Sequence, residues 1–398
     1  MIHTGRHFLQ IPGPTNVPER VLRAIDRPVI DHRGPEFAQL AKEIFEGIRP
    51  IFKTSGPVII YPASGSGAWE AAIVNTLSPG DRVLMFETGH FALGWKGMAE
   101  RLGLVVDWIP GNWRRGADLN KLEVRLARDT THEIKAVMVV HNETSTGSVS
   151  GISEVRRLMD QARHPSLLMV DAISSLGAMD YRQDEWGVDV TIVGSQKGLM
   201  LPPGLGFNAI SEKAKRANQS AKMPRSYWDW QEILKQNEAG FYPYTPATNL
   251  LYGLRESIQM FNEEGLENVF RRHHRLAEAA RAAVRAWGLE IVCEEPAEYS
   301  STVTAVFTPE GHDAEHLRRA ILETFDMSLG AGLSKLHGKA FRIGHLGHFN
   351  DLTLVGTLGG IEMGLRLAAV PHQKGGVMAA LEHLCAPSKK VPPQSATA

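Results

Sequence analysis

The chain has 398 residues, which is enough for one large hydrophobic core and a second, smaller domain. Apolar residues make up 43% of the chain and charged residues 22%, and the formal net charge is −1, so no global field would attract nucleic acid or an acidic membrane. The first residues form no long apolar segment and no apolar run approaches the roughly 20 residues of a membrane span, so we expect a cytoplasmic protein.

Short apolar runs alternate with helical stretches from about residue 55 to residue 210. The predicted strands are Val58–Tyr61, Arg82–Glu87, Val105–Ile109, Ala136–His141, Leu167–Asp171 and Val188–Gly194. The predicted helices between them are Trp69–Leu77, Trp95–Leu102 and Ser153–Ala162. Several strands are uninterrupted apolar runs, as expected when helices cover both faces of a sheet. The alternation predicts an α/β fold with a mostly parallel sheet, in which ligands collect beyond the carboxyl ends of the strands.

The rest of the chain predicts a smaller α+β domain. A helix over Asn249–Glu264 is expected to close the large domain. The elements predicted after it are helices Leu266–Trp287 and Ala314–Thr324 and strands Glu290–Cys293, Ser301–Phe307 and Ala340–Gly344. We therefore expect an N-terminal arm at 1–20, a large domain at 21–262, a small domain at 263–385 and a disordered Pro/Ser-rich tail at 386–398.

Lys197 and Asp171 both stand where an apolar strand ends. This pair suits pyridoxal 5′-phosphate (PLP), because an amine can form a Schiff base with the aldehyde and a carboxylate can keep the pyridine nitrogen protonated. Charges at strand ends also often face solvent. Each residue alone therefore leaves a purely structural role open.

A phosphate could bind at Ser64-Gly65-Ser66, which follows a predicted strand and precedes a predicted helix. Small residues let backbone N–H groups approach an anion, and a helix N-terminus favours negative charge. Gln196, beside the lysine, could donate an amide N–H to the same phosphate. The loop matches neither a Walker A motif nor a clean GxGxxG motif, and such a turn can equally be only a helix cap.

Other candidate site residues come from several segments of the chain. Phe91 could stack on a flat cofactor or belong to the core. Thr144 could donate to a ring hydroxyl oxygen or cap a helix, and Thr245 offers a hydroxyl on a Pro-rich turn. Arg342 stands on an apolar strand, where a buried guanidinium needs either a substrate carboxylate or an internal salt bridge.

We expect no metal site. Cys293 and Cys385 form no CxxC pair and have no histidine at ligand spacing. His345 and His348 lack a third plausible ligand nearby.

Taken in order, these segments resemble the class V, fold type I, PLP-dependent aminotransferases, and among them the alanine/serine–glyoxylate branch. The resemblance extends from Pro12-Gly-Pro-Thr-Asn16 to Arg342-Ile-Gly-His-Leu-Gly347. Its most specific motifs are Gly194-Ser-Gln-Lys-Gly198 with Pro202-Pro-Gly204, Val170-Asp-Ala-Ile-Ser-Ser-Leu-Gly177, and Tyr242-Pro-Tyr-Thr245 before Leu254-Arg-Glu-Ser257. It implies a mostly parallel seven-stranded sheet in the large domain and a smaller α+β C-terminal domain.

The resemblance also implies a role for each matching residue. Lys197 would be the Schiff-base lysine and Asp171 the partner of the pyridine nitrogen. Arg342 would hold the substrate α-carboxylate, while Pro14 and Thr15 of the N-terminal arm would line the mouth of the site. The other cofactor-binding residues would be Ser64, Gly65, Ser66, Phe91, Thr144, Ile173 and Gln196, with Tyr242 and Thr245 reaching the cofactor phosphate of the neighbouring subunit in a homodimer with shared active sites.

The activity implied is a ping-pong transfer of an amino group between small amino acids and keto acids, with the Lys197 amine as general base. We expect L-serine and glyoxylate as substrates, giving hydroxypyruvate and glycine. L-Aspartate and L-alanine stay open as donors, because they differ from serine by one small group. A non-catalytic PLP-binding protein and a nucleotide-binding α/β enzyme also stay open. Cysteine desulfurase activity is rejected, because residues 329–338 contain no cysteine.

Overall fold

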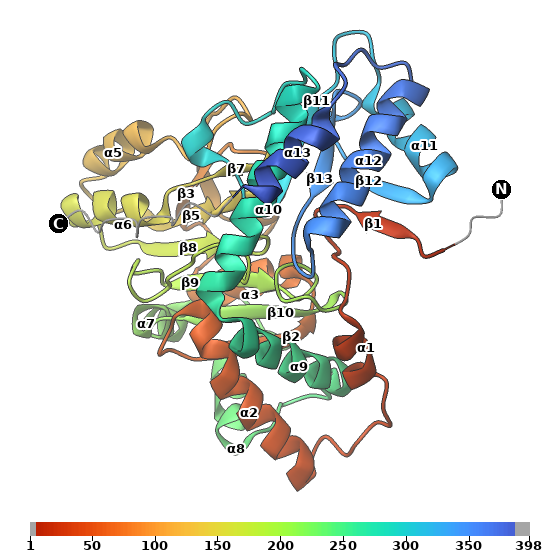
Figure 1. Ribbon diagram of the computed structural model, residues 1–398. Helices are drawn as coiled ribbons and strands as arrows, with labels where there is room; N and C mark the ends of the chain where they lie inside the picture. The colour runs from red at the N-terminus through yellow and green to blue at the C-terminus, as the bar shows by residue number, and fades with distance from the viewer. Residues whose placement is uncertain (1–4, 387–398) are drawn as a thin grey trace.

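A computed structural model describes residues 5–386, and its centre is a seven-stranded sheet (Figure 1). In sheet order the strands are β2 (Val58–Ala63), β10 (Gly204–Ile210), β9 (Val190–Gly194), β8 (Leu167–Asp171), β5 (Ile134–Val140), β3 (Arg82–Phe86) and β4 (Val105–Ile109). All neighbours run parallel except β10, which is antiparallel to both β2 and β9. The fold class predicted from the sequence is confirmed.

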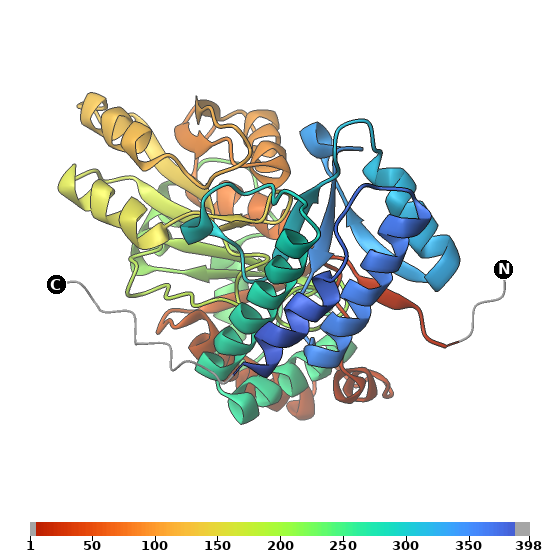
Figure 2. The same ribbon diagram turned by 45° about the horizontal axis from the view of Figure 1, so that its top comes forward.

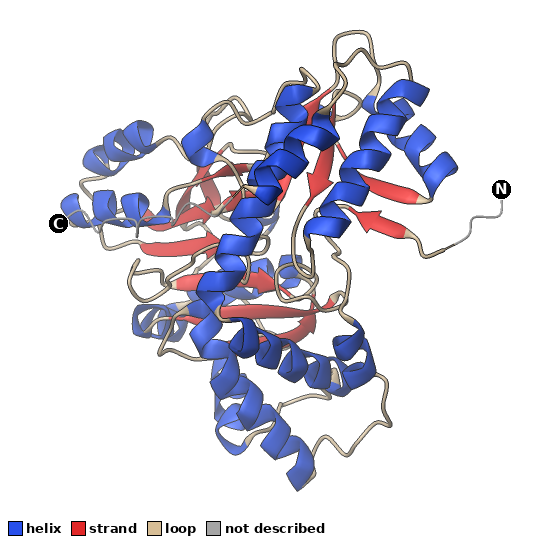
Figure 3. Cartoon of the chain, viewed as in Figure 1, coloured by secondary structure: helices blue, strands red, loops and turns tan. Residues whose placement is uncertain are grey.

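Helices cover both faces of this sheet, because its strands carry apolar side chains on both sides (Figure 3). In β2, Val58 and Ile60 belong to one buried cluster, and Ile59 and Tyr61 belong to the other. The first cluster includes residues of α1 (Glu19–Ile25), α2 (Pro35–Phe52), α5 (Leu119–Arg128), α6 (Ile152–Gln161) and α9 (Thr248–Glu264). The second includes residues of α3 (Gly65–Thr76), α4 (His90–Arg101), α7 (Glu212–Ser220) and α8 (Trp230–Ala239).

A second sheet joins the beginning of the described chain to its last third. Its strands, in order, are β1 (Phe8–Gln10), β12 (Met327–Ala331), β13 (Ala340–Gly344) and β11 (Val303–Phe307). The helices of this part of the chain are α10 (Leu266–Ala286), α11 (Ala314–Phe325), α12 (Asp351–Leu367) and α13 (Gly376–Cys385). Figure 2 shows the teal α10, the blue elements that follow it and the red β1 gathered on one side of the large sheet. The domain boundaries given above stay predictions.

Some expectations about local structure need correction. Glu290–Cys293 is not a strand, since only Ile291 forms an isolated bridge, with Val306. Strands β1, β10 and β12 were missed, as was the short pair β6 (Asn142–Glu143) and β7 (Ser148–Val149). Apart from Ala386, the tail expected at 386–398 lies outside the described residues. Within 5–386 no helix is long and apolar enough to cross a membrane.

The carboxyl ends of β8 and β9 lie side by side. The two strands are parallel neighbours, and Asp171 at the end of β8 is in register with Ile192. Beyond Gly194 the chain makes a tight turn, in which the Ser195 hydroxyl donates to the Pro202 carbonyl at 2.7 Å and accepts from the Leu205 N–H at 3.1 Å. This turn carries Lys197 to the same edge of the sheet as Asp171.

Candidate active site

Lys197 is buried, with 8% of its surface exposed. Its amine donates a hydrogen bond to the carbonyl oxygen of Pro12 at 2.7 Å. Burial, helped by the nearby positive charge of Arg342 and opposed by the negative charge of Asp171, lowers the pKa of Lys197 to about 8. A lysine with this pKa can act as a nucleophile or a base near neutral pH.

Asp171 is also buried, and both of its carboxylate oxygens accept hydrogen bonds. Oδ1 accepts from the Ile173 N–H at 2.8 Å, and Oδ2 accepts from the Trp69 indole N–H at 2.9 Å. Burial raises the pKa of Asp171 to about 7, against the effect of these two hydrogen bonds and of Lys197; the charge of Glu143 raises it further. Over residues 5–386 the carboxylate forms no salt bridge. It is therefore suited to a cationic partner that the protein does not supply.

The N-terminus of α3 lies against the ends of these strands. Ser64 is the N-cap of α3, and its hydroxyl accepts from the Gly67 N–H at 3.4 Å. A Cβ on Gly65 would collide with the side chain of Ile173, and a Cβ on Gly194 would lie 3.2 Å from both the Gly65 nitrogen and the Gln196 Oε1 atom. The structure thus brings the loop of Ser64, Gly65 and Ser66 together with Ile173 and Gln196.

Gln196 has an unsatisfied polar atom in this place. Its Oε1 atom is buried and has no hydrogen-bond partner in the described chain. Turning the side-chain amide over would present its N–H donors instead. A buried amide with an open hydrogen bond, beside the free N–H groups of a helix N-terminus, is suited to an anion such as a phosphate.

Phe91 and Thr144 are positioned by a network around Glu143. The buried Glu143 carboxylate accepts from the backbone N–H groups of Phe91 at 3.3 Å and Ala92 at 3.1 Å, and so caps the first turn of α4. It also accepts from the N–H and hydroxyl of Ser145. The next residue, Thr144, donates its hydroxyl to Ser174 at 2.7 Å. Phe91 is partly exposed and packs at the edge of the core, and its stacking on a cofactor stays a prediction.

Arg342 has no carboxylate partner in the described part of the chain. Its guanidinium donates from Nε to the Ala331 carbonyl at 2.7 Å and from Nη1 to the Thr144 carbonyl at 3.0 Å. Burial lowers the pKa of Arg342 to about 10, and the charge of Glu143 opposes this. The internal salt bridge considered above is thus not seen between residues 5 and 386. A buried guanidinium held by carbonyls keeps donors for a ligand carboxylate.

The N-terminal segment crosses directly over Lys197. The Thr15 N–H donates to the Gln196 carbonyl at 3.1 Å, and the Thr15 hydroxyl donates to the Lys197 carbonyl at 3.2 Å. Any Cβ on Gly13 would collide with the Lys197 side chain. Pro14 stands between these two residues in the chain, and its role in lining the mouth of the site stays a prediction.

Tyr242 and Thr245 are not brought to this group by any hydrogen bond in the described chain. The Tyr242 ring packs beside Phe37 and Phe45 of α2, while its buried hydroxyl has no partner in the described chain. Thr245 is exposed. Both residues therefore have hydroxyl groups that could bind to another molecule.

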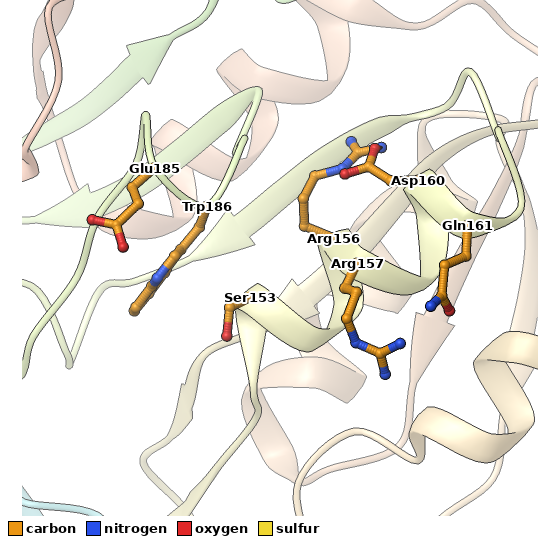
Figure 4. A pocket seen from close by; sticks show the side chains of 7 residues that line it. All are labelled: Ser153, Arg156, Arg157, Asp160, Gln161, Glu185 and Trp186. Carbon is orange, nitrogen blue, oxygen red and sulfur yellow. The ribbon is translucent and has the colours of Figure 1, made fainter. Parts of the chain in front are cut away.

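A separate surface depression of about 510 Å³ runs along α6 (Figure 4). It is lined by Ser153, Arg156, Arg157, Asp160, Gln161, Glu185 and Trp186. None of these residues belongs to the group around Lys197. Arg156 pairs with Asp160, and Arg157 pairs with Glu154, so the arginines are already neutralised.

Sequence analysis did not identify Trp69 or Glu143. Each of them binds a site residue that is distant in the sequence: Trp69 is 102 positions from Asp171, and Glu143 is 52 positions from Phe91. A possible signal for Trp69 was its place one helical turn after Gly65, which brings both residues to the same face of α3.

The chain is similar to known aminotransferases. The family model described as aminotransferase class-V matches residues 7–335. A serine–glyoxylate aminotransferase of Arabidopsis thaliana is 47% identical over 387 residues, with 96% of each chain covered. An L-aspartate–glyoxylate aminotransferase of Paracoccus denitrificans is 46% identical over 382 residues, again with 96% of each covered.

Among solved structures, ureidoglycine–glyoxylate aminotransferase from Bacillus subtilis superposes with a TM-score of 0.88 at 27% identity, covering 96% of this chain and 99% of that one. The family match and the curated relatives each span most of the chain. The protein belongs to the class V aminotransferases.

Proposed function

We propose that this aminotransferase uses PLP to move the amino group of L-serine to glyoxylate, giving hydroxypyruvate and glycine. The observation that carries the proposal is the buried pair of Lys197 and Asp171 at adjacent strand ends, with an unpaired Arg342 nearby. The choice of serine rests on similarity to serine–glyoxylate aminotransferases.

The residues around Lys197 fit PLP. Asp171 is a buried carboxylate without a cation, which matches a protonated ring nitrogen. The buried Gln196 Oε1 atom beside the α3 N-terminus has no partner in the described chain, and turning the amide over would place an N–H donor there for a phosphate. When bound, PLP supplies an aldehyde that condenses with amines and a ring that takes up the electron pair of the substrate α-carbon.

Lys197 is proposed to move the α-proton of the substrate. Because burial brings its pKa to about 8, a fraction of the amine is neutral at physiological pH and can accept a proton. The Pro12 carbonyl holds the free amine by a hydrogen bond of 2.7 Å, so Lys197 stays within the site when it is not covalently engaged. Asp171, at the end of the neighbouring strand, contributes a negative charge when it is ionised.

Arg342 is proposed to hold the α-carboxylate that serine and glyoxylate share. Its two carbonyl contacts fix the plane of the guanidinium, which orients the remaining N–H donors for a bidentate ion pair. We expect Arg342→Ala to raise KM for both serine and glyoxylate by about 10²–10³-fold, as for the loss of a hydrogen-bonded charge pair. Steady-state kinetics with each substrate varied in turn measure this.

Arg156→Ala is a matched control, because Arg156 is a half-buried arginine on α6 whose charge is already paired with Asp160 and which lies outside the group around Lys197. Its KM values should stay within about twofold of the wild type. An unchanged KM in Arg342→Ala would mean that the carboxylate is bound elsewhere.

We further propose a homodimer in which Tyr242 and Thr245 contact the cofactor phosphate of the partner subunit. The unsatisfied Tyr242 hydroxyl and the exposed Thr245 support this arrangement. The cytoplasmic location expected from composition stays a prediction.

Aspartate is the second candidate donor, because one similar relative is an L-aspartate–glyoxylate aminotransferase. L-Alanine is a third candidate donor. A PLP-binding protein without catalysis would not need a group to hold a substrate carboxylate, and Arg342 has no carboxylate partner in the described chain. A screen of L-serine, L-aspartate and L-alanine against glyoxylate, with kcat/KM determined for each pair, decides between them. We expect serine to have the highest value. Turnover with aspartate alone would replace the serine assignment, and no turnover with any donor would refute the proposed function.

A further inference from the structure

The Asp171 carboxylate is oriented by two donors of different kinds. The Ile173 N–H is a backbone group two residues away, which any residue at position 173 except proline would supply. The Trp69 indole N–H comes from a different helix, α3, and donates to the other oxygen at 2.9 Å. An indole nitrogen can only donate, so it favours the ionised, acceptor form of the carboxylate.

Trp69 is held rigidly on its other side by α4. Its ring stacks on Trp95 with centroids 5.9 Å apart and an interplanar angle of 17°. Gly94, also on α4, lies beside the same indole, since a Cβ there would be in van der Waals contact with its six-membered ring at 3.8 Å. Only 5% of the Trp69 surface is exposed. The indole N–H therefore has one orientation, and it points at Asp171.

We infer that Trp69 is a positioning residue for Asp171: its indole N–H holds the carboxylate ionised and turned toward the place of the cofactor ring nitrogen. This inference rests on the proposed function, because it assigns Trp69 to the same site. Helix α3 would then have two roles in the site. The first turn of the helix offers N–H groups for the phosphate, and Trp69, one turn later, fixes the group that meets the opposite end of the cofactor.

The hydrogen bond to Oδ2 also acts on the charge of Asp171. Burial and Glu143 both favour the protonated acid, whereas the hydrogen bonds from Ile173 and Trp69 and the charge of Lys197 favour the carboxylate. Losing that donor would raise the pKa of Asp171 further above 7. A neutral Asp171 could not stabilise a positive charge on the ring nitrogen.

The stacked pair supplies a matched control. Trp69→Phe keeps an aromatic ring against Trp95 and removes the N–H that binds Asp171. Trp95→Phe also replaces one indole of the same stack with a phenyl ring. The N–H that it removes is buried and donates to no atom of the described chain. The two variants differ chiefly in whether Asp171 loses a donor.

The first test follows the visible absorption of the protein reconstituted with PLP, as a function of pH. Trp69→Phe should shift the pH midpoint of the spectral change in the same direction as Asp171→Asn does, while Trp95→Phe keeps the wild-type midpoint. Trp69→Phe should also lower kcat by about 10–100-fold with KM within about twofold, as for loss of a hydrogen bond to a charged group. Equal behaviour of Trp69→Phe and Trp95→Phe, in midpoint and in kcat, would overturn the inference.

A double-mutant cycle separates action through Asp171 from a loss of packing. In the Asp171→Asn background, Trp69→Phe should change kcat by less than about twofold, because the group on which it acts is already gone. Additive losses would show a packing role only. The cycle stays informative if Trp69→Phe is less stable, since both backgrounds carry the same packing change. A wild-type protein that takes up PLP without any visible band would count against the proposed function, whereas a normal band with an unchanged midpoint in Trp69→Phe counts against the role of Trp69 alone.

Discussion

Replacing Lys197 with alanine should abolish transamination, lowering kcat by several orders of magnitude. Lys197 is proposed both to attach the cofactor and to move the α-proton, and loss of a group with two roles in the chemistry has effects of this size. The variant keeps Ser64, Gly65 and Gln196, the residues proposed to bind the phosphate, so PLP should still bind. Single-turnover kinetics and equilibrium dialysis with PLP measure the two properties separately.

Lys213→Ala is a suitable control for this experiment. Lys213 donates to the Ser166 carbonyl at 2.6 Å, just before the amino end of β8. Like Lys197 it binds a backbone carbonyl, but it does so at the amino ends of the strands rather than at their carboxyl ends. It should retain wild-type kcat. Full activity in Lys197→Ala would remove the lysine from the mechanism.

Asp171→Asn should lower kcat by about 10²–10⁴-fold, because breaking a buried charge pair costs about 3–5 kcal/mol. The asparagine is nearly isosteric but neutral, so the ring nitrogen of PLP would lose its anionic partner. KM should change little, since the substrate carboxylate is assigned to Arg342. A variant with wild-type kcat would show that the charge of Asp171 has no part in the reaction.

The same variant has a second readout in the cofactor-free protein. The pKa of Asp171 is about 7 in the folded state and about 3.9 in an unfolded chain, so the folded state binds more protons between these values. The contribution of Asp171 to the free energy of unfolding is therefore largest below pH ~4 and falls as pH rises toward 7, by at most about 4 kcal/mol. Urea unfolding at a series of pH values should show this decline in the wild type relative to Asp171→Asn. Parallel curves for the two proteins would contradict the raised pKa.

Apolar runs were the most reliable guide to the fold. Strands Leu167–Asp171 and Ala340–Gly344 begin and end where the sequence predicted, because each is a compact run bounded by polar or glycine-rich residues. β10 was missed because two of its first three residues are glycines, which weaken a strand pattern. The structure gives a reason for one of them: a Cβ on Gly206 would lie 2.7 Å from the Ser64 carbonyl oxygen.

Glu290–Cys293 shows the opposite error. Its residues have strand propensity, yet only Ile291 pairs with a neighbouring strand, through a single bridge. The Val292 N–H still donates to the Ala305 carbonyl of β11 at 2.9 Å, but the Val292 carbonyl accepts from the side chain of Arg114 at 3.0 Å. A local pattern cannot reveal that a side chain from elsewhere takes the hydrogen bonds of a ladder.

Candidate site residues could be predicted from the sequence where their position in a predicted strand suggested a chemical role. Lys197 and Asp171 follow strand ends, and an arginine on an apolar strand indicates a ligand or an ion pair. Trp69 and Glu143 could not be found this way, because each acts through a hydrogen bond to a residue far along the chain. The expected roles of Tyr242 and Thr245 depend on a second subunit and stay predictions.

Reduction of the PLP-loaded protein with borohydride, followed by mass spectrometry of its peptides, tests the central claim most directly. Reduction makes a Schiff base permanent, so the lysine that carries the cofactor retains a pyridoxyl phosphate mass. The account predicts this mass on the peptide that contains Lys197, and its loss in Lys197→Ala. A pyridoxyl phosphate group on a different lysine in the wild type, or on none, would contradict it.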